Sequence, residues 1–236
     1  MRRRREARLR RKHTVDTAKN AKRREASVRK AREDSSAVDG ARWQGWSGAV
    51  LAGGESRRMG RDKAMLRMAG EPMWRRQMEV LRAAGVETVV VVRRKGQRRL
   101  NRAVPQVWDG WENAGPLAGL EAALGAASGR WVAVLAVDMP GIDAEWFRRL
   151  RRFCAPGCGA VVRHASGTEP LAAIYPREAL SVVSRRLKEG RRSMQELVTA
   201  LARGRRMRLV RVAESERARW RNFNTPEDWR EGGDAK

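Results

Sequence analysis

The chain has 236 residues, 42% of them hydrophobic, which is enough for one globular domain with a substantial core, or for a domain with an appendage. Its formal net charge of +25 predicts a polyanionic partner, such as nucleic acid, an anionic membrane or a phosphorylated substrate, without choosing among them. No apolar run approaches the roughly 20 residues of a membrane span, and no apolar segment follows the arginine-rich start as in a secretory signal, so we expect a soluble, cytoplasmic protein.

Residues 1 to about 46 are dense in arginine and lysine and nearly free of large aliphatic side chains. Such a segment cannot bury enough apolar area to offset the entropy lost on ordering. We expect a disordered or loosely helical basic extension over residues 1–46, followed by a globular domain over residues 47–236. A solvated tail, or an upstream start codon that is not used, explains the extension more simply than a nucleic-acid-binding arm, because no aromatic residue stands among the basic ones before Trp43.

From Gly48 onward, short apolar runs alternate with segments of helical periodicity. The predicted strands cover residues 48–54, 87–94, 103–108, 130–140, 159–164, 170–175 and 207–212. The predicted helices cover residues 73–85, 115–127, 143–153, 177–190, 193–204 and 225–232. The last helix has Thr225 as its N-cap and Pro226 at its first position. Strands that alternate with helices predict a doubly wound α/β fold with a mostly parallel sheet, whose ligands gather at the carboxyl ends of the strands.

The stretch VLAGGESRRMGRDKAML, residues 50–66, places two glycines between a strand and a basic, helix-capable segment. A turn of this kind lets backbone N–H groups approach an anion closely, so it predicts a phosphate site. Asp138 follows the buried run WVAVLAV, so we expect it to lie at the same edge of the sheet as the two glycines. A carboxylate beside phosphates most naturally holds Mg²⁺, which takes its other ligands from phosphates and water. The alternatives are a plain tight turn at the glycines and a turn or N-cap role for Asp138.

Several signatures are absent from the sequence. It contains no G-x-x-x-x-G-K-[ST] and no G-x-G-x-x-G after a strand, which disfavours a P-loop NTPase and a dinucleotide-dependent oxidoreductase. Kinase and α/β-hydrolase signatures are also missing. The two cysteines, Cys154 and Cys158, have only His13 and His164 as companions, which is poor material for a zinc site. We expect both cysteines to be structural and reduced.

The stretch LAGGESRRMGRDK resembles the signature loop of nucleotidyltransferases, which join a nucleoside monophosphate to a phosphorylated acceptor. Further pieces follow it in order up to Trp229, namely the spacing from Asp109 to GPLAGL, then VDMP, EPLAAIY, GRRSMQELV and NFNTPEDW. Each piece alone is weak, since NTPED is mostly a helix-capping phrase and GPLAGL suits a helix start. In this order, together, they resemble the molybdenum cofactor guanylyltransferase family.

This resemblance implies a Rossmann-like fold and the Mg²⁺-dependent transfer of GMP from GTP to the terminal phosphate of molybdopterin, with release of pyrophosphate. It implies GTP and molybdopterin, or its molybdate form, as substrates, and the proteins of molybdopterin synthesis and insertion as partners. The residues that it assigns to the nucleotide are Leu51, Ala52 and Gly53 at guanine and ribose, Gly54 to Met59, including Ser56, around the phosphates, and Asp109 at the nucleoside.

The same resemblance assigns Arg58 to the β- and γ-phosphates, Lys63 to the α-phosphate and Asp138 to Mg²⁺. These roles suit the reaction. An anionic phosphate must attack an anionic α-phosphorus, so the enzyme must position the two groups and supply positive charge that offsets their repulsion. For Lys63 and Arg58 the alternative is a solvated surface cation. Asn222 and Asn224 would lie near the acceptor, and capping of the turn is the alternative for both.

One departure from the family concerns the nucleoside. The family commonly has an asparagine at the end of the second strand, where this chain offers Arg93 or Arg94. A cytidylyltransferase for the same pterin, or a nucleotidyltransferase that acts on a sugar or another phosphate, is therefore the alternative within the enzyme class. The alternative from another class is a basic nucleic-acid-binding or ribosome-associated protein, which the net charge favours and the lack of a known recognition motif disfavours.

Overall fold

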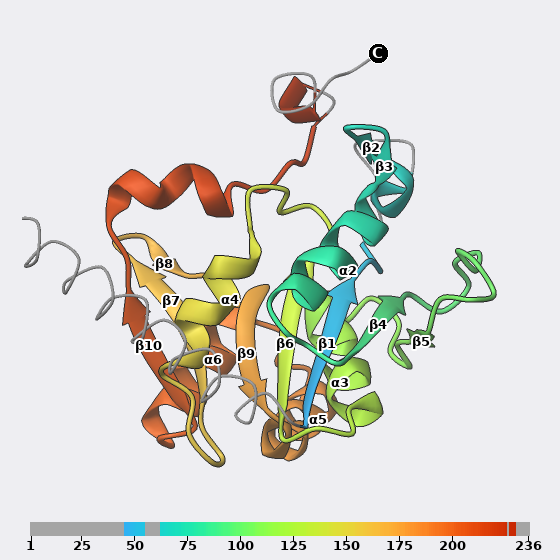
Figure 1. The fold of residues 1–236 in the computed structure, drawn as a ribbon. Coiled ribbons are helices and arrows are strands. Elements are labelled where there is room, and N and C mark those ends of the chain that lie inside the picture. The colour runs from blue at the N-terminus through green and yellow to red at the C-terminus, as the bar shows by residue number, and fades with distance from the viewer. Residues whose placement is uncertain (1–44, 55–61, 226, 230–236) are drawn as a thin grey trace, which may run out of the picture. The chain divides into compact units, whose positions relative to one another are not determined.

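The computed structural model describes residues 45–54, 62–225 and 227–229. Its centre is an eight-stranded sheet in the order β10-β7-β9-β6-β1-β4-β5, with the short β8 paired to β7 (Figure 1). The strands of this sheet are β1 (Trp46–Leu51), β4 (Thr88–Arg93), β5 (Gln106–Trp108), β6 (Trp131–Ala136), β7 (Gly159–His164), β8 (Gly167–Thr168), β9 (Ala172–Pro176) and β10 (Met207–Arg211). All described residues fall in one compact unit, Gly45–Lys236, and the predicted extension lies almost entirely outside them.

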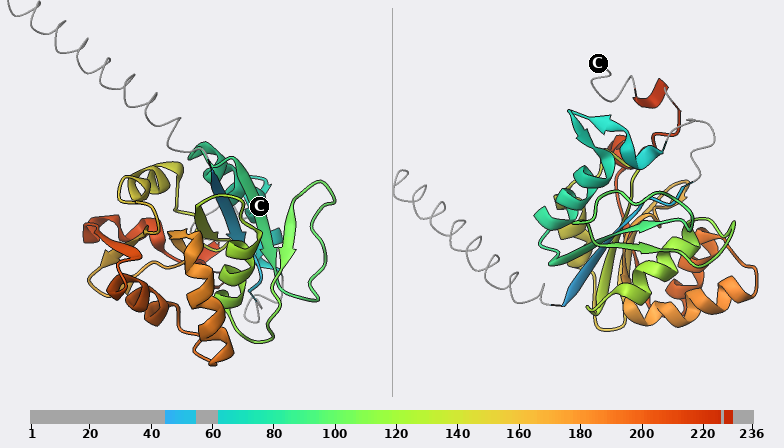
Figure 2. Two further views of the ribbon diagram at one scale, coloured as in Figure 1. Left: turned by 90° about the horizontal axis from the view of Figure 1, so that it is seen from below. Right: turned by 90° about the vertical axis from the view of Figure 1, so that its right-hand side faces the viewer.

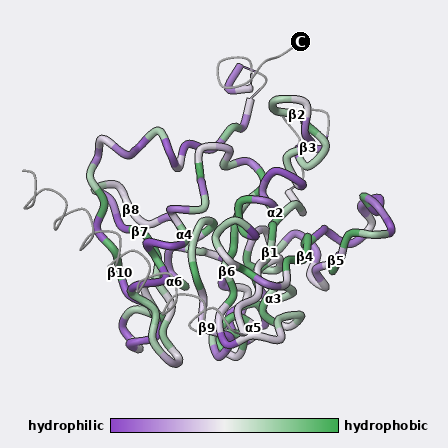
Figure 3. The backbone as a smooth tube through the Cα atoms, viewed as in Figure 1, coloured by the Kyte–Doolittle hydropathy of each residue, from purple (hydrophilic) through white to green (hydrophobic). Residues whose placement is uncertain are grey.

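The sheet is mostly parallel, as predicted. Strand β1 pairs in parallel with both β4 and β6, so that Val50 lies opposite Val91 on one side and Leu135 on the other. The pairs β4–β5 and β7–β10 are also parallel, whereas β9 runs antiparallel to β6 and to β7. Every residue of β1 is buried, as expected for a central strand that is covered on both faces. Figure 3 shows the hydrophobic residues gathered along these central strands.

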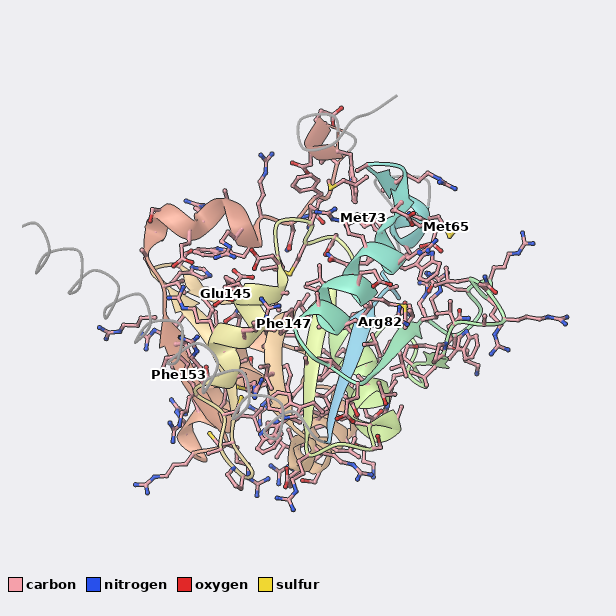
Figure 4. All side chains as sticks on the ribbon, viewed as in Figure 1. Met65, Met73, Arg82, Glu145, Phe147 and Phe153 are labelled. Atoms are coloured by element: carbon pink, nitrogen blue, oxygen red, sulfur yellow. The ribbon has the colours of Figure 1, made fainter. Side chains whose placement is uncertain are left out.

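Helices cover both faces of the sheet, as the two views of Figure 2 show. One face carries α2 (Met73–Ala83) and α4 (Ala144–Arg151), and the other carries α3 (Pro116–Ala126), α5 (Leu180–Lys188) and α6 (Met194–Arg203). Met73 of α2 and Phe147 of α4 are fully buried, while Arg82 and Glu145 lie on the outer surface of the same two helices (Figure 4). Among the described residues, no helix is long and apolar enough to cross a membrane.

Several short elements complete the described chain. They are the 3₁₀ helices η1 (Lys63–Met65), η2 (Arg177–Ala179) and η3 (Glu214–Trp220), and a small hairpin of β2 (Arg67–Met68) and β3 (Glu71–Pro72). The predicted N-cap of the last helix is present, because the Asp228 backbone N–H donates to Thr225 Oγ1 at 3.2 Å. Pro226 lies outside the described residues. Cys154 and Cys158 are both free thiols, and burial raises the pKa of Cys154.

The first strand begins earlier and ends earlier than the sequence predicts. It starts at Trp46, which is buried and stacks on Trp131 with ring centroids 4.9 Å apart, and it ends at Leu51. Gly53 and Gly54, which the prediction includes in the strand, lie beyond it. The strand therefore ends at the point where the predicted phosphate turn begins.

Candidate active site

A cavity of about 720 Å³ opens at the carboxyl ends of β1, β4 and β6. Its wall includes Leu51, Ala52, Gly53 and Gly54 from the end of β1 and the turn after it. Asp138 follows β6 on the same edge and lines the same cavity. The structure thus brings the glycine turn and the carboxylate together where a doubly wound sheet gathers its ligands.

The two glycines of the turn meet different surroundings. A Cβ atom at Gly53 would lie 3.1 Å from the backbone nitrogen of Arg94, which is tighter than an ordinary contact. Gly53 therefore lets the chain after β1 pass close to the end of β4. A Cβ atom at Gly54 would meet nothing within 4 Å, so this residue faces open space at the cavity. Ser56 and Arg58 lie outside the described residues, and their phosphate contacts stay predictions.

Lys63 joins three distant segments of the chain at one wall of the cavity. Its Nζ donates to Asp138 Oδ2 at 2.9 Å and to Asn224 Oδ1 at 2.7 Å. Its side chain is only 14% exposed, so Lys63 is not a freely solvated surface cation. The backbone of the third segment is fixed as well, because Phe223 N donates to the Asp138 carbonyl at 2.8 Å. A cation, a carboxylate and an amide oxygen therefore stand together at the cavity.

The two predicted acceptor residues differ in their placement. Asn224 lines the cavity, while Asn222 is exposed and is not part of its wall. The Asn224 side chain accepts from Lys63, and its backbone N–H donates to Asp228 Oδ2 at 2.8 Å, so Asn224 belongs to the turn before the last helix, while its contact with the acceptor stays a prediction. That N–H bond and those from Thr225 and Arg221 hold the pKa of Asp228 well below its ordinary value. The turn that caps the last helix thus also presents Asn224 to Lys63.

Asp109 and the first turn of α3 form another part of the wall. Asp109 is 7% exposed, and burial raises the pKa of its carboxyl, against the opposing effects of the Lys95 backbone N–H and the Arg94 charge. Gly115 is the N-cap of α3 and Pro116 is its first residue, and both line the cavity. The positive end of a helix dipole suits an anionic or polar ligand there.

The two arginines at the end of β4 have separate roles. Arg94 lines the cavity. Arg93 instead turns into the interior, where its Nη2 donates to Asp62 Oδ2 at 2.6 Å and its Nη1 donates to the Ala52 carbonyl at 3.2 Å. Asp62 in turn caps η1, because Asp62 Oδ1 accepts from Ala64 N at 3.0 Å.

Sequence reasoning gave no role to Asp62 or to Gln77. An aspartate immediately before a short helical segment is an N-cap signal, and it could have identified Asp62. Gln77 is fully buried on α2 and donates to the carbonyls of Ala136 and Met139, at 3.3 Å and 2.8 Å, which flank Asp138. A polar side chain on the buried face of an amphipathic helix is the signal that could have identified it.

The donor set of the cavity limits which metal ion it can hold. In the described part of the chain, no group of three or more His, Cys, Asp and Glu side chains could hold a metal. Among the described residues of the cavity wall, Asp138 offers a carboxylate beside Lys63, and Asp109 offers a second carboxylate on another part of the wall. A single carboxylate suits Mg²⁺, which keeps several waters and binds substrate phosphates.

Comparisons with known proteins agree with one another. The family model for a MobA-like NTP transferase domain matches residues 48–207. Over 185 residues the chain is 62% identical to a probable molybdenum cofactor guanylyltransferase of Opitutus terrae, covering 77% of this chain and 92% of that protein. Over 188 residues it is 36% identical to a molybdenum cofactor guanylyltransferase of Xanthomonas euvesicatoria, covering 78% and 92% of the two chains.

Solved structures show the same fold. Molybdopterin-guanine dinucleotide biosynthesis protein A from Archaeoglobus fulgidus has a TM-score of 0.63 and 25% identity, over 79% of this chain and 96% of that chain. The 2-C-methyl-D-erythritol 4-phosphate cytidylyltransferase from Thermus thermophilus has a TM-score of 0.56 and 17% identity, over 77% and 94% of the two chains. At 17% identity, the similarity to the Thermus thermophilus cytidylyltransferase concerns the fold alone.

Proposed function

Since this chain belongs to the molybdenum cofactor guanylyltransferase family, within the MobA-like NTP transferases, we propose that it transfers GMP from GTP to the terminal phosphate of molybdopterin and releases pyrophosphate. The observation that carries the proposal is the Lys63, Asp138 and Asn224 cluster beside the glycine turn. The acceptor is molybdopterin or its molybdate form. The proteins that make and insert the cofactor would be its partners in the cytoplasm.

In this proposal the nucleotide lies along the wall that Leu51, Ala52 and Gly53 form, with Asp109 at the nucleoside. The triphosphate follows the turn from Gly54 onward, where Ser56 and Arg58 would contact it. The nucleotide is anionic and so is the phosphate that attacks it, so the main task of the site is to hold both in line and to offset their repulsion. No covalent nucleophile on the protein is needed.

Lys63 is the cation best placed to offset charge at the α-phosphate. Its ammonium group is shared between Asp138 and Asn224, which holds it at the cavity wall in one orientation. A phosphate oxygen competes well for an ammonium donor, since hydrogen bonds between charged groups are the stronger ones. Asn224 would then be released toward the acceptor, and its amide would orient a polar group there.

Asp138 is the residue that would hold Mg²⁺. It offers one carboxylate, with a side chain that is 20% exposed, and the remaining ligands would come from phosphates and water. When bound, the ion supplies counter-charge to the phosphates. Lys63 would then neutralise a phosphate oxygen instead of the carboxylate, so each of the two groups keeps a partner of opposite charge.

A panel of GTP, CTP, ATP and UTP, each with Mg²⁺ and molybdopterin, tests the proposal through the release of pyrophosphate. We expect release with GTP to exceed release with the other nucleotides, and to depend on the acceptor and on Mg²⁺. A preference for CTP would overturn the guanylyl assignment and keep the reaction class. Absence of release with all four nucleotides, from folded protein, would overturn the reaction class itself.

A further inference from the structure

Arg93 is a buried cation that lies away from the cavity. Its side chain is 1% exposed, and it reaches three segments of the chain. Besides the Ala52 carbonyl and the Asp62 carboxylate, its Nη2 donates to the Arg98 carbonyl at 3.2 Å, in the connection between β4 and β5. A guanidinium group carries five donors in a fixed plane, so it can hold several acceptors in one geometry.

Two of these acceptors come from segments that follow β1, at Ala52 and at Asp62. Ala52 is the residue before Gly53, and Asp62 is the residue before Lys63. One guanidinium group therefore ties the backbone where the turn leaves β1 to the side chain that precedes Lys63. Asp62 also accepts from Ala64 N, which fixes the first turn of η1 and hence the direction in which Lys63 leaves the backbone.

The energetics favour a positioning role over a purely stabilising one. A buried ion pair recovers little more than the cost of removing its charges from water, so its presence is weak evidence for stability. It does impose a specific geometry, because either charge alone is unfavourable in the interior. The Asp62 side chain is 30% exposed, so that residue can be changed without leaving a fully buried cavity.

We propose that the Arg93–Asp62 pair positions Lys63, and that Arg93 does so by holding the Ala52 carbonyl and the Asp62 carboxylate in one geometry. This inference rests on the proposed function, because it assigns Lys63 to the nucleotide. Arg93 and Asp62 act through Lys63 and touch no substrate. The pair therefore sets the fraction of enzyme molecules whose Lys63 ammonium group is in place. Its loss should affect kcat more than nucleotide binding.

Three variants test this role, namely Arg93→Met, Asp62→Asn and the double variant. Asparagine keeps an oxygen for the cap at Ala64 and removes the ion pair, so Asp62→Asn should fold even if Arg93→Met does not. We expect each single variant to lower kcat by about tenfold or more, since a displacement of about 1 Å can cost 10² in rate, with a smaller effect on the KM for GTP. The kcat of the double variant should fall no further than that of the more impaired single variant, because both changes remove the same ion pair.

Arg186→Met is the matched control. Arg186 is also buried, with a side chain that is 3% exposed, and it pairs with Glu196 at 2.6 Å between α5 and α6. We expect this change to lower the Tm as Arg93→Met does, while kcat measured well below the Tm stays at the wild-type value. Equal kcat in wild type, Asp62→Asn and any folded Arg93→Met protein would overturn the proposal, as would fully multiplicative losses in the double variant.

Hydrogen exchange supplies a measurement that does not depend on the reaction. The amides of residues 62–66 should exchange faster in Arg93→Met and in Asp62→Asn than in wild type, and should be unchanged in Arg186→Met. If wild type transfers no nucleotide while this exchange still rises, the proposed function fails and the positioning of this segment stands. Unchanged exchange in Asp62→Asn would overturn the positioning role whether or not the enzyme transfers GMP.

Discussion

Lys63 is the residue on which the proposed chemistry depends most. We predict that Lys63→Met lowers kcat/KM by about 10² or more, because the transition state at the α-phosphate loses a preorganised cation. Steady-state release of pyrophosphate measures the effect. Lys188→Met, at the exposed end of α5, is the control and should leave the rate unchanged. A Lys63→Met enzyme with wild-type kcat/KM would show that the ammonium group contributes only to structure.

Asp138 is the predicted ligand of Mg²⁺. Asp138→Asn keeps the volume and one acceptor for Lys63 but removes the negative charge, so we expect a normal fold and loss of Mg²⁺-dependent turnover. Circular dichroism checks the fold, and titration of activity with Mg²⁺ checks the ligand. Near-normal activity at saturating Mg²⁺ would exclude Asp138 as the metal ligand.

Asp109 should lower stability at neutral pH while it serves the site. Its pKa is raised by burial above the ordinary 3.8, so the native state holds the proton more tightly than the unfolded chain. Stability then falls as pH rises from 3.8 through the raised pKa, and the loss persists above it. We predict that Asp109→Asn raises the Tm at pH 7 and raises the KM for GTP. The gain in Tm should disappear below pH 3.8, and a lower Tm at pH 7 would contradict the argument.

At the scale of single residues, the sequence predicted the groups at the cavity better than the groups that hold them. Gly53, Gly54 and Asp138 follow strands of one sheet, so the rule for doubly wound folds brings them to one edge. Asp62 and Arg93 lie 31 residues apart, and their pairing depends on the direction in which one arginine turns at the end of β4. Two adjacent arginines in the sequence do not reveal which one faces the cavity.

The first turn of α3 depends on a backbone conformation that few residues adopt. Gly115 has φ 65° and ψ −154°, a region that is essentially restricted to glycine. A Cβ atom there would meet nothing within 4 Å, so any cost of Gly115→Ala is conformational. We predict a loss of about 1–3 kcal/mol, measured by denaturant unfolding.

Gly110→Ala is the control for this prediction. Gly110 also has no atom within 4 Å of a Cβ position, but its φ is outside the left-handed region. We expect its stability to stay close to wild type. Equal stabilities of the Gly115→Ala and Gly110→Ala proteins would show that the chain relaxes at Gly115 without cost.

At the scale of elements, the periodic segments were predictable and the irregular ones were not. Helix α3 was expected at residues 115–127 and is found at Pro116–Ala126. Strand β9 was expected from an apolar run, but its antiparallel direction depends on tertiary pairing with β6, which a run of apolar residues does not encode. Helix η3 has no helical period of apolar residues and was missed, although Trp220 at its end stacks on His164 with ring centroids 5.3 Å apart.

At the scale of the whole molecule, the candidate site is assembled across long separations in sequence. Lys63 meets Asp138 across 75 residues and Asn224 across 161 residues. The first meeting follows from sheet topology, since both residues come after central parallel strands. The second does not, because η3 and the turn after it carry no strand or helix pattern that fixes their course. Only the family resemblance pointed to Asn224.

The basic extension belongs to the scale of the whole chain, and truncation tests its role. We predict that deletion of residues 1–44 leaves a folded enzyme with a similar rate of GMP transfer, because this segment has few large aliphatic residues for a core. Deletion of residues 1–46 should differ, since it also removes Trp46, which is 3% exposed and stacks on Trp131. Loss of a buried tryptophan costs about 3–5 kcal/mol, so the longer deletion should unfold at lower denaturant concentration.

Retention on heparin over a range of salt concentrations separates the two explanations of the extension. If residues 1–44 are a polyanion-binding arm, their deletion should remove a steeply salt-dependent retention and leave catalysis unchanged, because each phosphate-like contact releases counterions. If residues 1–44 are a solvated tail, their deletion should change the salt dependence of retention only by the amount expected from the loss of their net charge. Loss of soluble, folded protein on deletion of residues 1–44 would contradict both explanations. It would show that the extension contributes to the fold, and that the predicted domain boundary is wrong.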